Sequence, residues 1–151
     1  MCLVPIEEIK TAETDILCYK WVLSKASLTM WIAPSQGNRF PFNSLLEAEP
    51  ARDGIKGRRF RLETVLGLNT KFDVSIVINE GFHAYISRDS ARRNACFECE
   101  DLYLATCVIP KGSEYCLGEN DEIVSTHMIV FSDDGEYEKY AAEHNDIEKL
   151  K

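Results

Sequence analysis

Short apolar segments, each closed by glycine, proline or asparagine, constrain the fold of this chain more than any other feature of its sequence. Residues 72–78 alternate polar and apolar side chains and then become wholly apolar, and residues 102–109 stay largely apolar up to a turn at Pro110. Segments of this length that are rich in β-branched and aromatic side chains favour strands over helices. The sequence therefore predicts a molecule built on a sheet.

The other expected strands are also short, and they follow one another without long helices between them. They comprise residues 16–23, 28–33, 59–66, 82–86 and 122–131. A doubly wound parallel sheet is disfavoured, because that fold alternates strands with long helices and carries a glycine-rich phosphate loop, which this sequence lacks. We therefore predict a single α+β domain over residues 1–151, with a mostly antiparallel sheet of short strands and two or three peripheral helices.

Helical patterns occur in three stretches outside the expected strands. Residues 43–49 lie between two prolines, and residues 89–96 follow Ser87, which is a suitable N-cap. Residues 135–150 have an acidic start and a weakly apolar stripe, which predicts a C-terminal acidic helix. Residues 1–14 show little periodicity and are expected to form an irregular N-terminal arm.

The net charge of the chain is negative, which restricts its partners. The 151 residues include 25 acidic and 17 basic side chains, giving a net charge of −8 at pH 7. This balance disfavours a general affinity for nucleic acid or for an anionic membrane surface. No apolar run approaches the ~20 residues of a membrane-spanning helix, and the first residues lack a signal-peptide pattern. We therefore expect a cytoplasmic protein without a membrane partner.

Basic side chains gather in one stretch in the middle of the chain. Arg52, Arg58, Arg59 and Arg61 lie close together in the sequence. An exposed loop and strand edge accounts for such a group, because lysine and arginine are favoured there. The same side chains are also suited to bind a phosphate-bearing ligand through charge-assisted hydrogen bonds. Both interpretations follow from the sequence.

The six cysteines are expected to be reduced thiols, because the chain shows no secretory signal. Cys18 and Cys107 lie in strand-like segments and are predicted to pack in the core. Cys96 and Cys99 form a Cys-x-x-Cys pair, which can complete a tetrahedral zinc site only with two further ligands. Candidates for those ligands are Cys107, Cys116, His83 and His127. A single pair does not define a zinc site, so we expect no metal and keep a zinc-stabilised interaction module as an alternative.

Candidate site residues occur where a glycine turn leads into an aromatic strand. Side chains alternate along a strand, so His83 and Tyr85 share one face, and the other face carries Phe82, Ala84 and Ile86. If the second set packs inward, His83 and Tyr85 form an exposed polar platform. Otherwise His83 is a strand histidine bonded to a neighbouring carbonyl.

Glu122 begins a later strand, directly after an acidic turn. A carboxylate beside His83 and Tyr85 is suited to hold a ribose hydroxyl and to stabilise a developing cation. This interpretation requires residues 81–86 and the segment that starts at Glu122 to lie side by side in the sheet.

The order of several motifs in residues 81–131 resembles that of small uncharacterised proteins carried by phages and mobile elements of bacteria. The motifs are Gly81-Phe82-His83-Ala84-Tyr85-Ile86, Ala91 on a helix, Cys107-Val108-Ile109-Pro110-Lys111-Gly112 and Asp121-Glu122-Ile123-Val124-Ser125. This resemblance covers about a third of the chain and implies no established activity.

The same order also resembles the ADP-ribosyltransferase fold, in which a Gly-aromatic strand is followed by a helix and a later strand starts with a catalytic glutamate. The resemblance implies that Tyr85 borders a nicotinamide pocket and that Glu122 has the ribose-binding catalytic role, with NAD bound. The first expected strand, Cys18-Tyr19-Lys20-Trp21, lacks the Arg-Gly or His-Gly-Thr that holds NAD in that family.

The acidic composition and the lack of a complete catalytic motif favour a non-enzymatic cytoplasmic binding protein. Its expected partner is a host protein or a nucleotide-like ligand, and it needs no cofactor. The alternative is an ADP-ribosyltransferase-like enzyme that uses NAD, with Glu122, Tyr85 and His83 as its catalytic residues.

Overall fold

The computed structural model describes residues 3–23, 30–32, 39–41, 43–47, 62, 64–68, 74–78, 81–94 and 102–150. The strands are β1 (Lys10–Thr11), β2 (Ile16–Leu23), β3 (Met30–Ile32), β4 (Arg39–Pro41), β5 (Leu45–Glu47), β6 (Val65–Leu68), β7 (Val74–Val77), β8 (Phe82–Tyr85), β9 (Leu102–Ile109), β10 (Glu114–Leu117), β11 (Glu122–Ser125) and β12 (His127–Val130). The helices are α1 (Arg88–Arg93) and α2 (Asp134–Glu143), and a 3-10 turn, Glu119–Asp121, precedes β11. The expected sheet-rich, mostly antiparallel fold is therefore confirmed.

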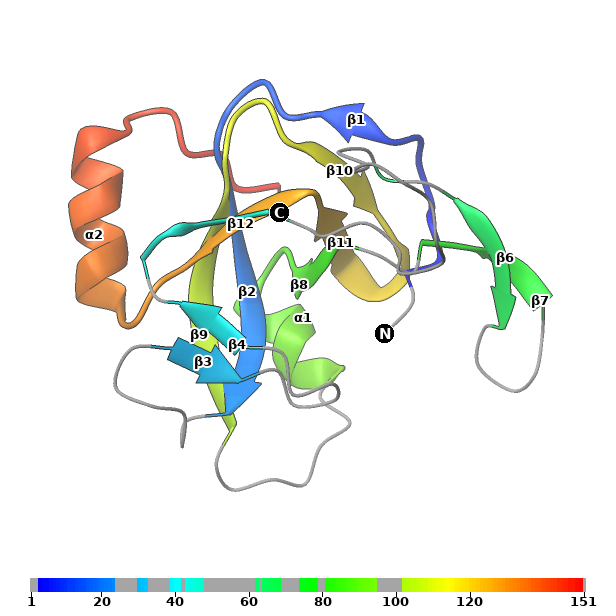
Figure 1. The fold of residues 1–151 in the computed structure, drawn as a ribbon, viewed down its shortest axis with the longest axis horizontal. Coiled ribbons are helices and arrows are strands. Elements are labelled where there is room, and N and C mark those ends of the chain that lie inside the picture. Colours follow the sequence, from blue (N-terminus) through cyan, green and yellow to red (C-terminus); the bar gives the residue numbers. More distant parts are fainter. Residues whose placement is uncertain are drawn as a thin grey trace.

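The larger sheet has the strand order β1-β10-β11-β8-β2-β9-β12-β5, with β3 and β4 attached beside β2 (Figure 1). At its centre β2 and β9 pair antiparallel over their whole length, from Ile16 opposite Ile109 to Leu23 opposite Leu102. Both strands have the bounds that the sequence predicted. β6 and β7 form a separate hairpin that projects from the body (Figure 1).

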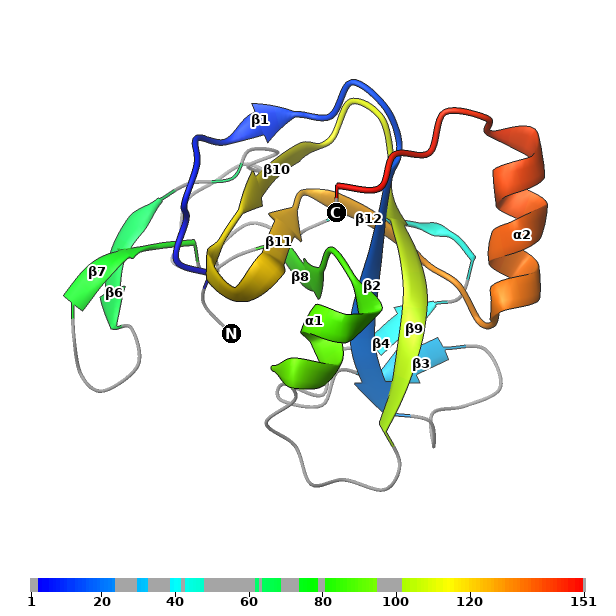
Figure 2. The same cartoon turned by 180° about the vertical axis from the view of Figure 1, so that it is seen from behind.

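The two faces of the sheet are covered by different parts of the molecule. The inner face carries the main core cluster: Ile16, Cys18, Val22, Ala84, Ala105, Cys107, Ile109, Ile123, Met128 and Val130. The outer face carries Tyr19, Trp21, Tyr85 and Leu104, which pack with Ala91 of α1. Figure 2 shows α1 in front of β2 and β9, on the side that is hidden in Figure 1. The predicted core positions of Cys18 and Cys107 are confirmed, because both are fully buried.

α1 begins where the sequence predicted a helix. Ser87 is its N-cap, and the Ser87 hydroxyl accepts a hydrogen bond from Ser90 N at 3.1 Å. Ala91 is fully buried on the sheet side of the helix, and Trp21 Nε1 donates to Ala91 O at 2.9 Å. The helix ends at Arg93, earlier than the predicted residue 96. α1 therefore packs on the outer face through the buried Ala91 and the hydrogen bond from Trp21.

The predicted helix over residues 43–49 is wrong, because Leu45–Glu47 forms the edge strand β5. Asn43 starts this segment in a left-handed conformation, with φ 56°, which asparagine tolerates better than most residues. Asn43 N donates to Val130 O at 3.0 Å, and Ser132 N donates to Asn43 Oδ1 at 3.1 Å. These bonds align the segment with β12, and pairing with that strand overrides the local helical preference.

Two further segments differ from their predicted form. Residues 122–131 were expected as one strand, but they divide at Thr126 into β11 and β12, which have different neighbours. Thr126 N donates to Glu114 O at 3.0 Å, so the break is fixed by β10, a strand that the sequence did not predict. Half of the expected strand over residues 59–66 lies outside the described residues, and β6 begins near its end, at Val65.

Both ends of the chain are tied to the sheet more closely than the sequence indicated. Leu3 is fully buried, and its backbone exchanges hydrogen bonds with Ile78, at 3.0 and 2.8 Å. The acidic helix α2 ends at Glu143 rather than at residue 150. The chain then returns to β2, where Leu17 N donates to Glu148 O at 2.9 Å. The segment expected to be an irregular N-terminal arm therefore includes strand β1, and the C-terminal segment adds a strand-like contact with β2.

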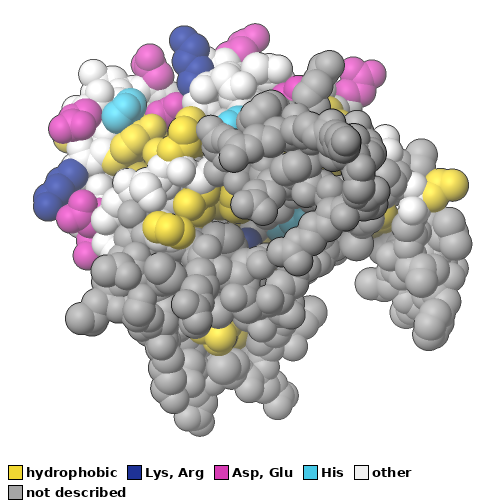
Figure 3. Space-filling model, in the orientation of Figure 1, with side chains coloured by type: hydrophobic (Ala, Val, Ile, Leu, Met, Phe, Trp, Pro, Cys, Tyr) yellow, Lys and Arg dark blue, Asp and Glu magenta, His cyan; other side chains and the backbone are white. Residues whose placement is uncertain are grey.

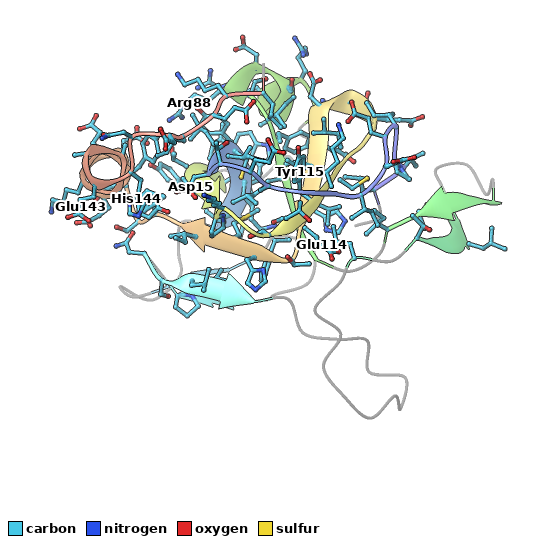
Figure 4. All side chains as sticks on the ribbon, turned by 90° about the horizontal axis from the view of Figure 1, so that it is seen from above. Asp15, Arg88, Glu114, Tyr115, Glu143 and His144 are labelled. Carbon is cyan, nitrogen blue, oxygen red and sulfur yellow. The ribbon has the colours of Figure 1, made fainter. Side chains whose placement is uncertain are left out.

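α2 is held against the sheet by aromatic side chains and one hydrogen bond. Phe131 contacts the rings of Tyr137 and Tyr140, with ring centres 5.7 and 5.4 Å apart. The Tyr140 hydroxyl donates to Asp15 Oδ2 at 2.7 Å, and Figure 4 shows Asp15 on the side of the sheet next to α2. The helix therefore docks on its own sheet.

Candidate functional site

Strands β8 and β11 lie next to each other, as the predicted site requires. They are antiparallel, with Tyr85 opposite Glu122 and His83 opposite Val124. Paired residues point to the same side of a sheet, so Tyr85 and Glu122 share the outer face. The expectation that these two segments are neighbours is therefore confirmed.

His83 does not belong to an exposed platform, because only 8% of its surface is exposed. Its Nδ1 lies 3.2 Å from Gly81 O, and its Nε2 lies 3.3 Å from Ile78 O. Burial, together with the nearby charge of Lys20, lowers the pKa of the imidazole from 6.5 to about 4. The platform prediction is wrong because both faces of β8 are covered, and His83 is instead a buried strand histidine whose ring nitrogens face two backbone carbonyls.

Tyr85 is also buried, and it packs against Leu104 and Ala91 under α1. Glu122, at the start of β11, stays half-buried. Burial, followed by the neighbouring charge of Glu119, raises the pKa of the Glu122 carboxyl. Of the three side chains predicted as catalytic, Glu122 therefore has the most solvent access.

α1 also fixes the turn from which β11 starts. Asn120 and Asp121 both have left-handed backbones, with φ 58° and 60°. The Ser90 hydroxyl donates to Asp121 Oδ2, and Arg93 Nη2 lies 3.6 Å from the same oxygen. Asn94 Nδ2 donates to Asn120 O at 3.2 Å. These contacts from one helix hold the backbone that precedes Glu122.

A row of four side chains crosses the outer face, one from each of four neighbouring strands. The strand register places Glu122 beside Tyr85, Tyr85 beside Tyr19, and Tyr19 beside Thr106. Because neighbouring strands are about 4.8 Å apart, the row spans roughly 14 Å. At one end of the row, Thr106 bonds both to Arg88 of α1 and to Asp134 of α2.

At the Thr106 end, Arg88, Tyr19, Thr106 and Asp134 form what we call the Arg88 cluster. The Arg88 guanidinium lies over the Tyr19 ring, with its carbon 4.8 Å from the ring centre. Arg88 Nη2 donates to Thr106 Oγ1 at 3.2 Å and to Asp134 Oδ1 at 3.3 Å. The Thr106 hydroxyl donates to the same Asp134 oxygen at 2.9 Å.

The Arg88 cluster is accessible from solvent. The side chains of Arg88 and Asp134 are 38% and 59% exposed. In the described part of the chain, Arg88 bonds only through Nη2, so its Nε and Nη1 donors are not used by the cluster. Figure 4 shows Arg88 on the α1 side of the molecule, away from the cyan edge strand.

Two further tyrosines have raised pKa values in this region, and Tyr103 itself packs against the inner core cluster. Burial, and after it the charge of Asp134, raises the pKa of Tyr103. Burial, and after it Tyr19, raises the pKa of Tyr137. The cluster therefore combines one guanidinium and one carboxylate with the aromatic ring of Tyr19.

Several of the predicted ligand-binding and zinc-binding residues are not among those that the structure describes. The basic group Arg52, Arg58, Arg59 and Arg61 lies outside the described residues, as do Cys96 and Cys99.

The other proposed zinc ligands lie apart from one another. Cys107 is in the inner core cluster, whereas Cys116 is in a second cluster with Leu3 and Val124. His127 Nδ1 lies 2.8 Å from Thr126 Oγ1. Among the described residues, no group of three or more histidine, cysteine or acidic side chains could hold a metal ion.

Comparison of the chain with protein-family models, with curated proteins and with solved structures gives no significant match. Within the described residues, no helix has the length and apolar character that a membrane span requires.

Proposed function

We propose that this protein binds a nucleotide-like anion at the Arg88 cluster, without catalysis. The observation that supports this function is an exposed guanidinium held in place by an aromatic ring, a hydroxyl and a carboxylate, with two of its nitrogens directed to no protein partner in the described residues. A planar guanidinium is suited to phosphate, because it can form two parallel charge-assisted hydrogen bonds.

The neighbouring carboxylate favours a nucleotide over a simple anion. Asp134 accepts hydrogen bonds at one oxygen from Arg88 and Thr106, which leaves its second oxygen for hydroxyl donors such as those of a ribose. A bare phosphate would be repelled by Asp134, whereas a ligand with both a phosphate and a sugar satisfies both charged groups. The stacking of Arg88 on Tyr19 reduces the conformational entropy that the side chain loses on binding.

The test is isothermal titration calorimetry with ADP and with ADP-ribose. We expect Arg88→Ala to weaken binding by about tenfold or more, since a charge-assisted hydrogen bond contributes about 1.5–3 kcal/mol. Arg92→Ala is the matched control, because Arg92 is exposed on the same short helix but is not part of the cluster. Wild-type protein that binds neither nucleotide, or equal affinities for wild type and Arg88→Ala, would refute the proposal.

ADP-ribosyl transfer from NAD is the second candidate function. It is favoured by the direct pairing of Glu122 with Tyr85 and by the half-buried carboxyl, whose pKa is raised by burial and by Glu119. Transfer of labelled ADP-ribose from NAD to proteins in a lysate would support this function if Glu122→Gln abolishes it. Glu119→Gln is the control, because it removes a neighbouring charge but keeps the proposed catalytic carboxylate. If the wild-type protein transfers no ADP-ribose, the second candidate function is refuted and nucleotide binding remains as the proposed function.

A further inference from the structure

Two tyrosine hydroxyls beside the Arg88 cluster make no hydrogen bond to the described part of the chain. One belongs to Tyr19, whose ring lies under the Arg88 guanidinium, and the other belongs to Tyr137 of α2. Both residues are half-buried. A phenol in such a position donates to water or to a ligand, because a partly buried donor without any partner is unfavourable.

The helical spacing places Tyr137 next to the Arg88 cluster. Tyr137 follows Asp134 by three residues in α2, so the two side chains lie one turn apart on the same face of the helix. Asp134 Oδ1 lies 3.3 Å from Arg88 Nη2. The ring of Tyr137 also contacts Phe131, with ring centres 5.7 Å apart, which restricts its orientation. Burial, and after it the proximity of Tyr19, raises the pKa of Tyr137, in agreement with two neighbouring phenols.

The rest of α2 offers little to an anion. Beyond Asp134 the helix carries three glutamates and one lysine, and acidic side chains lie around it at the left of Figure 3. Such a surface repels an anion along most of its length. A phenol donates a hydrogen bond without adding or removing charge. The hydroxyl of Tyr137 is therefore the group through which α2 can bind an oxyanion near Asp134.

The number of free oxygens on a phosphate decides how well the cluster can hold it. The fork of a guanidinium binds two oxygens of one phosphate. A terminal phosphate, as in ADP, has a third free oxygen, which needs a donor of its own. Each phosphate of a pyrophosphate that is bridged on both sides, as in ADP-ribose, has only two free oxygens. Donors beside the guanidinium therefore favour a terminal phosphate.

We propose that the hydroxyls of Tyr19 and Tyr137 bind the third oxygen of a terminal phosphate, while Arg88 binds the other two oxygens. The ligand class is then a nucleoside monophosphate or diphosphate, in preference to a nucleotide whose phosphates are bridged on both sides. This inference rests on the proposed function, since it takes Arg88 as the phosphate-binding residue.

The test compares ADP with ADP-ribose by isothermal titration calorimetry. We expect wild-type protein to bind ADP about tenfold more tightly, because only ADP offers the third oxygen. The double variant Tyr19→Phe/Tyr137→Phe removes both hydroxyls and keeps both rings. It should bind ADP about tenfold more weakly than wild type, and its affinity for ADP-ribose should change by less than about twofold. Tyr115→Phe is the control, because β10 lies three strands away from β2.

The double variant is expected to fold, since neither hydroxyl bonds to the described part of the chain and Arg88 still lies over an aromatic ring. Thermal unfolding followed by circular dichroism verifies this. Equal affinities of wild type for the two nucleotides, or an unchanged affinity of the double variant for ADP, would overturn the inference. In both cases a loss of binding in Arg88→Ala would still support the proposed function. If wild-type protein binds neither nucleotide, the proposed function and this inference are both refuted.

Discussion

Replacing Gly81 by alanine is expected to destabilise the protein by about 3 kcal/mol or more. Gly81 has φ +110°, and a Cβ at this position would lie 2.8 Å from Val124 Cγ2 and 2.9 Å from Ser125 O. The positive φ costs about 1–3 kcal/mol for a residue other than glycine, and overpacking costs typically 1–3 kcal/mol more. Ser125 O belongs to the backbone of β11, so it cannot move without disturbing the pairing of β8 with β11.

Gly112→Ala is the matched control for this substitution. Gly112 also has a positive φ, +89°, but a Cβ there would meet no atom within 4 Å. Its expected cost is therefore only the conformational strain, about 1 kcal/mol. Urea unfolding measures the difference between the two variants in the free energy of unfolding. The comparison requires that this free energy depends on the urea concentration with the same slope in both. Equal losses of stability for the two variants would show that the close approach of Gly81 to β11 contributes little.

Much of the strand pattern was predictable because it depends on local signals. β2, β9 and β8 are apolar segments bounded by turn residues, and β-branched and aromatic side chains mark them in the sequence. Ser87 could be recognised as an N-cap, because its hydroxyl precedes a short helical pattern. These features require no knowledge of distant contacts.

The errors occur where contacts distant in sequence decide the structure. Nothing near Asn43 shows that its backbone bonds to Val130, yet this bond converts a helical pattern into strand β5. The glycine turn before His83 led us to expect an exposed side chain. His83 is buried because other parts of the sheet and its surroundings cover both faces of β8. Neither effect can be predicted from the residues next to Asn43 or His83 in the sequence.

The Arg88 cluster was not predicted, because its members come from four separate segments. Tyr19 and Thr106 are neighbours only through the register of β2 and β9. Asp134 reaches them because α2 folds back on the sheet. The sequence did contain one signal. Arg88 directly follows the N-cap Ser87, so it is the first residue of a helix that packs on the sheet. That residues 81–86 and the segment starting at Glu122 are neighbours was expected, in contrast, although the register that pairs Tyr85 with Glu122 comes from the structure.

The stability of the protein is expected to decrease as the pH falls from 6.5 towards 4, because His83 resists protonation in the folded state. The pKa of its imidazole is about 4 in the folded protein, against an ordinary value of 6.5, and burial is the main cause. Between these values the unfolded chain binds a proton that the folded chain does not, so acid favours unfolding. Each pKa unit corresponds to 1.36 kcal/mol, so the loss from this residue approaches about 3 kcal/mol near pH 4.

Urea unfolding of wild type and of His83→Gln, measured at several pH values from 7 to 4, isolates this contribution. Glu122 acts in the opposite direction, since a carboxyl with a raised pKa takes up a proton more readily in the folded state and stabilises it as the pH falls. Its effect is common to both proteins, so the difference between their profiles reports His83.

The same comparison shows whether His83 donates hydrogen bonds to one or to both of the carbonyl oxygens that face its ring. A neutral imidazole has one N–H group and donates to only one of the carbonyls of Gly81 and Ile78, whereas an imidazolium donates to both. If the His83→Gln profile diverges from that of wild type, burial outweighs the second hydrogen bond and His83 is neutral in the folded protein. Parallel profiles would mean that the two carbonyls keep the imidazole as basic as it is in the unfolded chain.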